Sequence, residues 1–346
     1  MIGSLRRAAC AVAILAAAPA ATAAAPAGFR PVELVVRPIE RFLTTQDDTR
    51  FGMLEYRGGL ELGSADWEFG SLSGLDFAAD GSILAVSDRG RWFTARPVVE
   101  DGRLAGLTDA GLAPILNSAG EPLSGKRWGD AEGVRIVERD GRPTAYVVFE
   151  RVNAVRIFKG PDFATSRSVD VAMPQSFRAM TGRDGAEASA VAPAASPLAG
   201  GVVTIAELLR DGAGNTRGWI AGGRSPGPFA VHRFDDYDVT DADFLPGGDL
   251  LLLERKYGFP YGIAARIRRI AEADLKPGAT VDGPVIFEAT LGHQIDNMEG
   301  LAITSGPDGE TLIALLSDNN QNPLQRTLLL YFALVEERDA TARSID

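Results

Sequence analysis

Cysteine, histidine and lysine are scarce in this 346-residue chain. The one cysteine is Cys10, the two histidines are His232 and His293, and only four of the 35 basic residues are lysine. A single cysteine cannot form an internal disulfide, and beyond Cys10 the chain has neither a thiolate nucleophile nor a cysteine-containing zinc site. Two histidines also argue against a histidine-rich zinc or iron centre.

Basic residues are outnumbered, which excludes another class of function. The chain has 46 acidic and 35 basic residues, a formal net charge of -11, whereas binding to nucleic acid requires a basic surface. After the first residues no apolar run is long enough to cross a bilayer. We therefore expect no nucleic-acid partner and no membrane span, and the oligomeric state stays open.

The first 23 residues have the pattern of an export signal. Arg6 and Arg7 precede an apolar run at 8–18, and Ala21-Thr22-Ala23 supplies the small residues that signal peptidase requires. We expect cleavage after Ala23, a lead-in over residues 24–49, and one domain over 50–346. This organisation predicts a periplasmic or secreted protein, by the Sec or the twin-arginine route.

A repeat occupies most of the remaining chain. Each copy has a small or acidic opening, a short apolar run, a turn that often reads Asp-Gly or Gly-Gly, and a second apolar run ending in acidic residues. The openings are residues 73, 132, 187, 241 and 299, spaced 54–59 apart, and the second copy has room for strands at 134–137, 146–150, 154–158 and 168–172. Four-stranded units at this spacing are typical of propeller blades.

The predicted fold is therefore an all-β propeller of four-stranded blades. Five repeats are clear, and a sixth blade stays open. Strands at 51–56 and 59–62 are expected to complete the last blade. A pair of β-sandwiches is the rival fold, but it does not explain the period.

The repeat cores resemble a known family. The segments that carry the resemblance are Gly74-Leu75-Asp76-Phe77 with Ser87-Asp88-Arg89-Gly90, Asp243-Phe244-Leu245-Pro246-Gly247-Gly248-Asp249 with Glu254-Arg255, and Asn297-Met298-Glu299-Gly300-Leu301 with Ser317-Asp318-Asn319-Asn320. They are similar to the phytase-like domain named "esterase-like activity of phytase", over about residues 50 to 335. The resemblance implies an exported propeller that hydrolyses phosphate esters or other esters, and it assigns no catalytic residues.

Acidic and amide residues gather at two positions of each repeat. In a propeller blade the innermost strand and its neighbour are antiparallel, so the start of the first and the end of the second lie on one face. The starts carry Asp130, Glu132, Glu187, Asp241, Asp243, Asp296, Asn297 and Glu299, and the ends carry Asp88, Glu150, Glu207, Glu254, Asp318, Asn319 and Asn320. We expect these residues to converge on one mouth of the central channel.

Crowded carboxylates repel one another unless cations are present. Carboxylate and amide oxygens are hard ligands that suit Ca²⁺, which we expect first, or Mg²⁺. The predicted metal ligands are Asp88, Glu150, Glu207, Asp243, Glu254, Asn297 and Asp318. Glu132, Glu299 and His293 are the predicted catalytic residues, His293 as a general acid or base.

Basic residues directly follow three of these acids, in Asp88-Arg89, Glu150-Arg151 and Glu254-Arg255-Lys256. Metal ions with arginine suit phosphoester hydrolysis, because the metal polarises the phosphoryl group and the cations neutralise developing charge. We predict that Arg89, Arg151, Arg255 and Lys256 bind a small anionic ester. The competing interpretation is that the same pairs are salt bridges that hold blades together.

Trp92 and Trp128 flank the expected mouth, and each is compatible with a place in the pocket wall or in the core.

The leading hypothesis is an exported, metal-dependent phosphoesterase. A Ca²⁺-dependent lactonase or carboxylic esterase is a second hypothesis, since a metal polarises a carbonyl equally well and fold does not choose the reaction. A non-catalytic propeller that binds a ligand or partner is the third.

Overall fold

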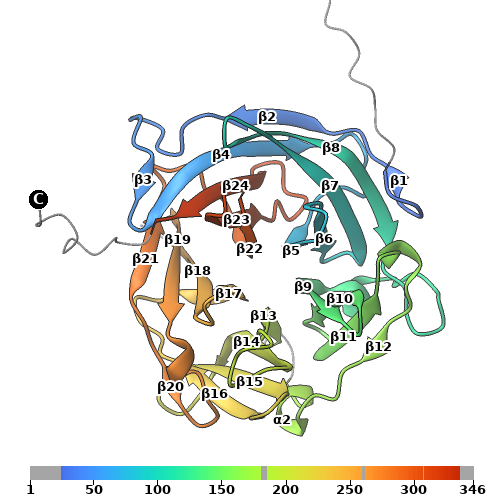
Figure 1. Ribbon diagram of the computed structural model, residues 1–346, viewed down its shortest axis with the longest axis vertical. Coiled ribbons are helices and arrows are strands. Elements are labelled where there is room, and N and C mark those ends of the chain that lie inside the picture. The colour runs from blue at the N-terminus through green and yellow to red at the C-terminus, as the bar shows by residue number, and fades with distance from the viewer. Residues whose placement is uncertain (1–24, 181–184, 259–261, 307, 336–346) are drawn as a thin grey trace, which may run out of the picture.

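The computed structural model describes residues 25–180, 185–258, 262–306 and 308–335. The expected export signal, with Cys10, lies outside these residues. Within them, five sheets surround a central channel, and each sheet runs from an inner strand near the axis to the rim (Figure 1). The prediction of an all-β propeller is confirmed, with five blades.

Each blade consists of consecutive antiparallel strands, to which short strands are added at the rim. The first blade contains β5 (Leu72–Phe77), β6 (Ile83–Ser87), β7 (Arg91–Glu100) and β8 (Arg103–Pro114), with β1 (Arg30–Pro31) outermost. The second contains β9 (Ala131–Arg139), β10 (Arg142–Phe149), β11 (Ala154–Lys159) and β12 (Val169–Asp170). The third contains β13 (Ala186–Val191), β14 (Gly201–Arg210), β15 (Thr216–Gly222), β16 (Gly227–Val231) and the parallel β20 (Thr280–Val281).

The fourth and fifth blades complete the ring. The fourth contains β17 (Asp238–Phe244), β18 (Leu250–Gly258), β19 (Gly262–Ile270) and β21 (Val285–Ala289). The fifth contains β22 (Met298–Ser305), β23 (Thr311–Ser317), β24 (Thr327–Leu334) and β4 (Leu54–Gly63), with β2 (Val35–Ile39) and β3 (Arg50–Phe51) beside β4. The described helices are α1 (Lys126–Gly129), α2 (Gln175–Arg178) and two 3₁₀ turns, Phe163–Thr165 and Glu272–Asp274. None of them is long and apolar enough to cross a membrane.

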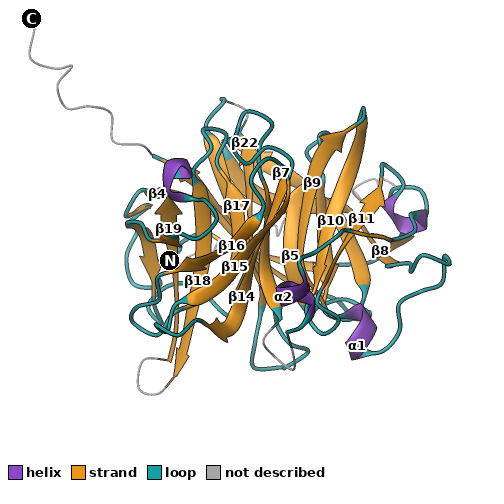
Figure 2. Ribbon diagram, turned by 90° about the horizontal axis from the view of Figure 1, so that it is seen from below, coloured by secondary structure: helices purple, strands orange, loops and turns teal. Residues whose placement is uncertain are grey.

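The two ends of the chain close the ring within the fifth blade. Strand β4, from the N-terminal part, pairs antiparallel with the C-terminal β24, from Leu62 opposite Thr327 to Leu54 opposite Leu334. The expected N-terminal contribution to the last blade is confirmed, although one long strand replaces the two short ones predicted. Figure 2 shows the blades from the side, with α1 and α2 at the same face of the disc.

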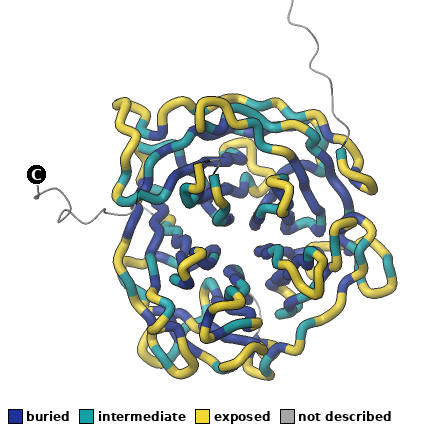
Figure 3. The backbone as a smooth tube through the Cα atoms, viewed as in Figure 1, coloured by how far each residue is buried: buried dark blue, intermediate teal, exposed yellow. Residues whose placement is uncertain are grey.

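Five apolar cores lie between successive blades. The run Leu250-Leu251-Leu252-Leu253 shows why its sequence is apolar throughout: Leu250 and Leu252 pack towards the third blade, and Leu251 and Leu253 towards the fifth. Because successive side chains of a strand point to opposite faces, a blade packed on both sides needs apolar residues at every position. The inner strands are accordingly buried along most of their length (Figure 3).

A buried arginine fills the middle of the channel. Arg135 of β9 donates to the backbone oxygens of Leu75 at 3.0 Å, Ala242 at 2.6 Å and Leu301 at 2.8 Å, on the inner strands of three other blades. Its guanidinium lies 2.7 Å from Asp241 Oδ1 and 3.6 Å from Asp243 Oδ1. The arginine therefore ties four inner strands together.

Three aspartates around Arg135 extend this network. Asp76 accepts from the backbone of Ile136 at 2.5 Å, Asp241 from Leu301 at 2.8 Å and Asp243 from Ile303 at 2.9 Å, each on the next inner strand. Burial, followed by repulsion from Asp243, raises the pKa of Asp76 to about 7, and burial raises that of Asp241 to about 6. Arg135 is the cation that offsets this crowding.

We expect the substitution Arg135→Met to lower the free energy of unfolding at pH 7 by about 3–5 kcal/mol, the usual cost of breaking a buried ion pair by removing one partner. Guanidinium chloride unfolding measures it. Arg142→Met, at an exposed arginine of β10, is the matched control and should change stability by less than about 0.5 kcal/mol. Equal unfolding midpoints for the two variants would contradict the role given to Arg135.

Candidate functional site

Each inner strand carries a β-bulge near its first residue. The pairing with the neighbouring strand skips one residue in every blade, and the skipped residues are Ser73, Glu132, Glu187, Thr240 and Glu299. A bulge bends the strand and re-aims the extra side chain, and bulges are common next to active sites. Three glutamates are thereby presented at the same level of the channel, above Arg135.

The second strand of each blade brings a residue to the same level. The backbone N–H of Asp88, Glu150, Glu207 and Asp318 donates to the residue two before the bulge, at 3.0, 3.1, 3.3 and 2.9 Å. In the fourth blade the corresponding residue is Arg255, which pairs with Asp238. We call these five residues, the five bulge residues and Asp130 together the mouth ring.

The fourth repeat differs from its predicted alignment by one residue. Thr240, not Asp241, occupies the bulge, so Asp241 and Asp243 point deeper and hold Arg135. Glu254 lies one residue before Arg255, the mouth residue of this blade, and its side chain contacts arginines of the fourth blade itself. The predictions of Asp243 and Glu254 as metal ligands are corrected accordingly, because the buried arginines beside them already neutralise their charge.

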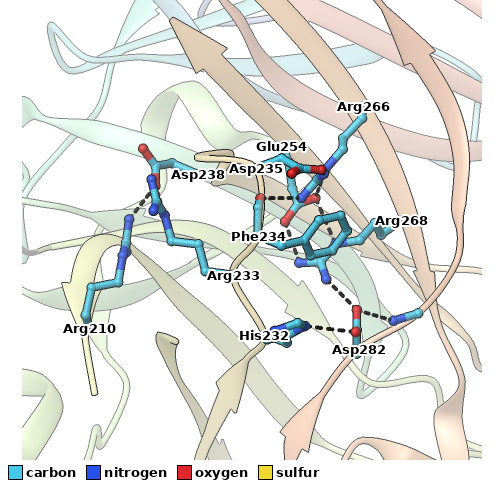
Figure 4. Close-up of polar contacts among 11 residues, drawn as sticks. Arg210, His232, Arg233, Phe234, Asp235, Asp238, Glu254, Arg266, Arg268 and Asp282 are labelled. Carbon is cyan, nitrogen blue, oxygen red and sulfur yellow. Dashed lines mark hydrogen bonds and ion pairs between the residues drawn. The ribbon is translucent and has the colours of Figure 1, made fainter. Parts of the chain in front are cut away.

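Glu254 belongs to a buried network on the side of the fourth blade (Figure 4). Its carboxylate lies 2.6 Å from Arg266 Nε and 2.5 Å from Arg268 Nη2. Arg268 continues to Asp282 at 2.8 Å, and Asp282 to His232 at 2.9 Å. Glu254 therefore forms a buried salt bridge within its own blade, with Arg266 and Arg268 and not with the adjacent Arg255, which contacts Glu207 and Glu299 instead.

One half of the mouth ring has its own cation. Arg255 donates to Glu299 Oε1 at 2.6 Å and to Glu207 Oε1 at 2.8 Å, and also to the side-chain oxygen of Asn297. The Asn297 amide donates to Glu299 Oε1 at 2.6 Å. Arg255 therefore sits among the acids as a fixed counterion, a different role from the substrate binding that the sequence suggested.

The other half contains a tight group of carboxylates. One oxygen each from Asp130, Glu132 and Glu150 lie within 4.8 Å of one another, and all three residues are buried. Lys126 of α1 reaches Asp130 Oδ1 at 2.7 Å and Asp88 Oδ2 at 2.5 Å, and Arg151 Nε reaches Asp130 Oδ2 at 2.7 Å. No hydrogen bond or ion pair to the Glu132 carboxylate is formed within the described part of the chain.

Burial and mutual repulsion raise the pKa values of these acids. Burial, with the Asp130 charge second, raises the pKa of Glu150 to about 7, and burial with the Glu299 charge raises that of Asp318 to about 8. Burial followed by neighbouring carboxylates also raises the pKa of Glu132 and Glu187 well above the usual range. The built-in cations thus leave negative charge in the ring incompletely balanced.

A divalent cation fits the Asp130–Glu132–Glu150 group. Three carboxylates within this distance are the ligands that Ca²⁺ and Mg²⁺ take in proteins, and Glu132 is not otherwise engaged. Asp88 is linked to the group through Lys126, and its Oδ1 is buried and without a hydrogen-bond partner among the described residues. Both oxygens of Asp130 contact cationic side chains, so Asp130 would share its charge between them and an ion.

A cleft opens beside this group. It has a volume of about 390 Å³ and is lined by Asp88, Lys126, Arg89, Arg91 and Trp67, among others. The Arg89 guanidinium stacks on the exposed Trp67 ring at 5.0 Å and donates to the Trp67 backbone oxygen at 2.9 Å. Arg91 is held by Glu68 at 2.6 Å. We call this hollow the mouth cleft; a larger hollow of about 780 Å³ lies outside the ring.

Other predicted residues lie away from the ring. His293 packs its ring on Phe42 at 5.1 Å and Phe51 at 5.5 Å, in the aromatic core of the fifth blade, so its predicted role as acid or base at the mouth is corrected. Lys256 lies 5.6 Å from the Tyr237 ring. Trp92 is buried in the core, whereas Trp128 is half exposed.

Sequence reasoning missed Lys126 as a member of the site. It precedes the second repeat by six residues and so falls outside the repeated pattern. Its position four residues before Asp130, in a chain with four lysines, is the signal that could have found it. The importance of Arg135, within a repeat, could not be inferred because its partners come from other blades.

The pH dependence of stability should reveal the crowding. Glu150 and Asp318 have raised pKa values in the folded state, so between about pH 4, the unfolded value, and pH 7–8 the folded protein binds protons that the unfolded chain has released. The free energy of unfolding of chelator-treated protein should therefore fall as pH rises through this window. Thermal unfolding between pH 5 and pH 8.5 measures it.

Calcium should oppose the loss of stability that we expect as the pH rises. At about 100 times its Kd, an ion that binds only the folded state adds about 2.7 kcal/mol to the free energy of unfolding. We expect a rise in Tm that is larger at pH 8 than at pH 5 and is lost in Glu132→Gln/Glu150→Gln. Glu138→Gln, at an exposed residue of β9, is the control. If neither Ca²⁺ nor Mg²⁺ changes the Tm of the wild type, a metal site of useful affinity is excluded.

The propeller resembles several solved structures at low identity. A thermostable family-43 glycoside hydrolase matches with a TM-score of 0.48 and 10% identity, over 76% of this chain and 89% of that one. An α-L-arabinofuranosidase from Lactobacillus brevis gives 0.47 and 12%, over 76% and 91%. The PQQ-bound aldose sugar dehydrogenase from Streptomyces coelicolor gives 0.43 and 14%, over 87% and 99%.

No curated protein matches this sequence. The profile of one family does, over residues 68–321, which span the chain from the mouth cleft to the end of the mouth ring. That region contains all five bulges and each of the strand ends that complete the ring. This chain belongs to the Phytase-like family, described as "Esterase-like activity of phytase".

Proposed function

We propose that this protein is an exported hydrolase of small phosphate esters that works with a divalent metal ion at the mouth ring. The observation that carries the proposal is the buried group of Asp130, Glu132 and Glu150, beside a cleft with arginine and lysine in its wall. The family description, which names phytase and esterase activity, supports an ester substrate. The pattern of the first 23 residues supports export.

In this proposal Asp130, Glu132 and Glu150 hold the ion, with Ca²⁺ expected before Mg²⁺. A bound divalent ion would polarise the phosphoryl oxygen and lower the pKa of a bound water. Lys126 fixes Asp88 and Asp130 through contacts of 2.5 and 2.7 Å, so the acid group is already organised. On the opposite side, Arg255 orients Glu299 and Glu207.

In this proposal Arg89 binds the substrate phosphate. Arg91, the other arginine of the mouth cleft, already donates twice to Glu68 Oε1, at 2.6 and 2.9 Å. Arg89 donates to one backbone oxygen, which leaves further N–H groups of its planar guanidinium for an oxyanion. Trp67 beneath it is 68% exposed and can contact the organic part of the ester.

Removing the charge of the acid group should abolish most of the activity. We expect Glu132→Gln and Glu150→Gln to keep the fold and to lower kcat/KM for nitrophenyl phosphate by about two to four orders of magnitude, the scale of losing a key electrostatic or acid–base group. Circular dichroism checks the fold. The control is again Glu138→Gln. Full activity in both glutamine variants would show that the mouth ring is not the active site.

Arg89→Ala should separate anionic from neutral substrates. We expect it to raise KM for nitrophenyl phosphate about tenfold or more, as a charged hydrogen bond is lost, and to leave nitrophenyl acetate hydrolysis nearly unchanged. Equal effects on both esters would argue against phosphate binding by Arg89.

A substrate panel decides between the reaction classes. It contains nitrophenyl phosphate, inositol phosphates, nitrophenyl acetate and simple lactones, each with Ca²⁺, with Mg²⁺ and with chelator. Metal-dependent hydrolysis of the acetate or lactones alone would replace the phosphatase with an esterase or lactonase. No hydrolysis under any condition would favour a propeller that only binds its ligand.

A further inference from the structure

A second and larger cleft lies on the other side of the segment that leads into α1. Its volume is about 780 Å³. Leu123 and Ser124 line both this hollow and the mouth cleft, so the two are neighbours that share a wall. Trp128 of α1 and residues from the first-to-second blade connection and from the second blade line the rest. We call it the α1 cleft.

Two arginines of the α1 cleft have unused hydrogen-bond donors. Arg156 stacks on the Phe149 ring at 4.8 Å and donates Nε to Asp170 Oδ1 at 3.0 Å. Its Nη1 is buried and has no acceptor among the described residues, and such groups are rare in native proteins. The exposed Arg167 extends across Gly120, where a Cβ would lie 2.9 Å from Arg167 Nε.

The acidic residues of the cleft are already engaged. Asp170 accepts the bond from Arg156, and Glu121 Oε2 accepts from the Asn117 amide at 3.1 Å. The Arg167 side chain forms no hydrogen bond or ion pair with the residues that the structure describes. Two arginines and two acids line the cleft, so its formal charges balance, and what remains unused are N–H donors of the arginines, which suit an anionic group.

Trp128 supplies the apolar part of the same cleft. Its indole is 49% exposed, although large aromatic side chains are usually covered. A ligand pocket combines apolar or aromatic surface with a few placed polar groups, and the α1 cleft has both. An aromatic ring that contacts Trp128 would bring an attached anionic group towards the arginines.

We propose that the α1 cleft binds an organic anion in which a phosphate or carboxylate is attached to a planar ring. Arg167 and Arg156 bind the anionic group, and Trp128 contacts the ring. The proposal does not rest on the proposed function, because none of these three residues belongs to the mouth ring.

Tryptophan fluorescence can locate the ligand. The two largely exposed tryptophans are Trp67 in the mouth cleft and Trp128 in the α1 cleft, whereas Trp92 and Trp219 are buried. Phenyl phosphate and benzoate, titrated separately in the presence of chelator, distinguish phosphate from carboxylate. We expect at least one of them to quench the wild type and Trp67→Phe saturably. The quench that comes from the α1 cleft should be absent in Trp128→Phe, where any remaining quench reports on Trp67 in the mouth cleft, and it should be absent altogether in Trp67→Phe/Trp128→Phe.

Calorimetric titration of charge variants tests the anion contact. Arg167→Gln, at an exposed residue, should raise Kd about tenfold or more, the scale of a charged hydrogen bond. Arg142→Gln, which removes an exposed arginine elsewhere in the second blade, should leave Kd unchanged. Glu132→Gln should also leave it unchanged, which separates this cleft from the mouth ring.

Three results would overturn the proposal. They are a quench that disappears in Trp67→Phe and persists in Trp128→Phe, an unchanged Kd in Arg167→Gln, or no saturable binding of either anion to the wild type. If the anion binds to the α1 cleft but the wild type hydrolyses no ester, the binding proposal is retained and only the proposed phosphoesterase activity is rejected.

Discussion

The arrangement of the whole molecule depends on the charged contact at its axis. Arg135 bonds the backbone of three other inner strands and neutralises Asp241, at a place where the five inner strands converge. Five interfaces between blades hold the ring from outside. Arg135 and its aspartates occupy the middle of the channel, and the acids at the strand starts and ends lie at the mouth above them.

The mouth ring is an incompletely neutralised cluster, and this property gives it chemistry. Five bulges bring three glutamates to one level, where burial disfavours their charged forms. Arg255 and Lys126 balance part of the charge from opposite sides. Asp130, Glu132 and Glu150 bring three carboxylate oxygens within 4.8 Å of one another, and this spacing suits a single cation.

The repeat and its apolar pattern were sufficient to predict the propeller. Runs such as Leu250–Leu253 reflect a blade buried on both faces, and the spacing of the openings reflects four strands each. Similarly, the acids at strand starts and ends identified Glu132, Glu150, Glu207, Glu299, Asp88 and Asp318 as one group, because antiparallel pairing brings those ends together whatever the neighbouring blades do. His293 was misplaced because its partner, Phe42, comes from the distant N-terminal lead-in.

What the sequence by itself determined is the class of fold and the type of residue at the mouth, since both follow from local periodicity. Only the tertiary structure decided the register of the fourth repeat. The sequence allows an alignment with Asp241 and Glu254 at the mouth, and another, one residue apart, with Thr240 and Arg255 there. A bulge at Thr240 selects between them, and its position depends on the fit of one blade against the next. For the same reason Arg135 and Lys126 acquired their roles only in the folded ring, because their partners lie on other blades or beyond the repeat.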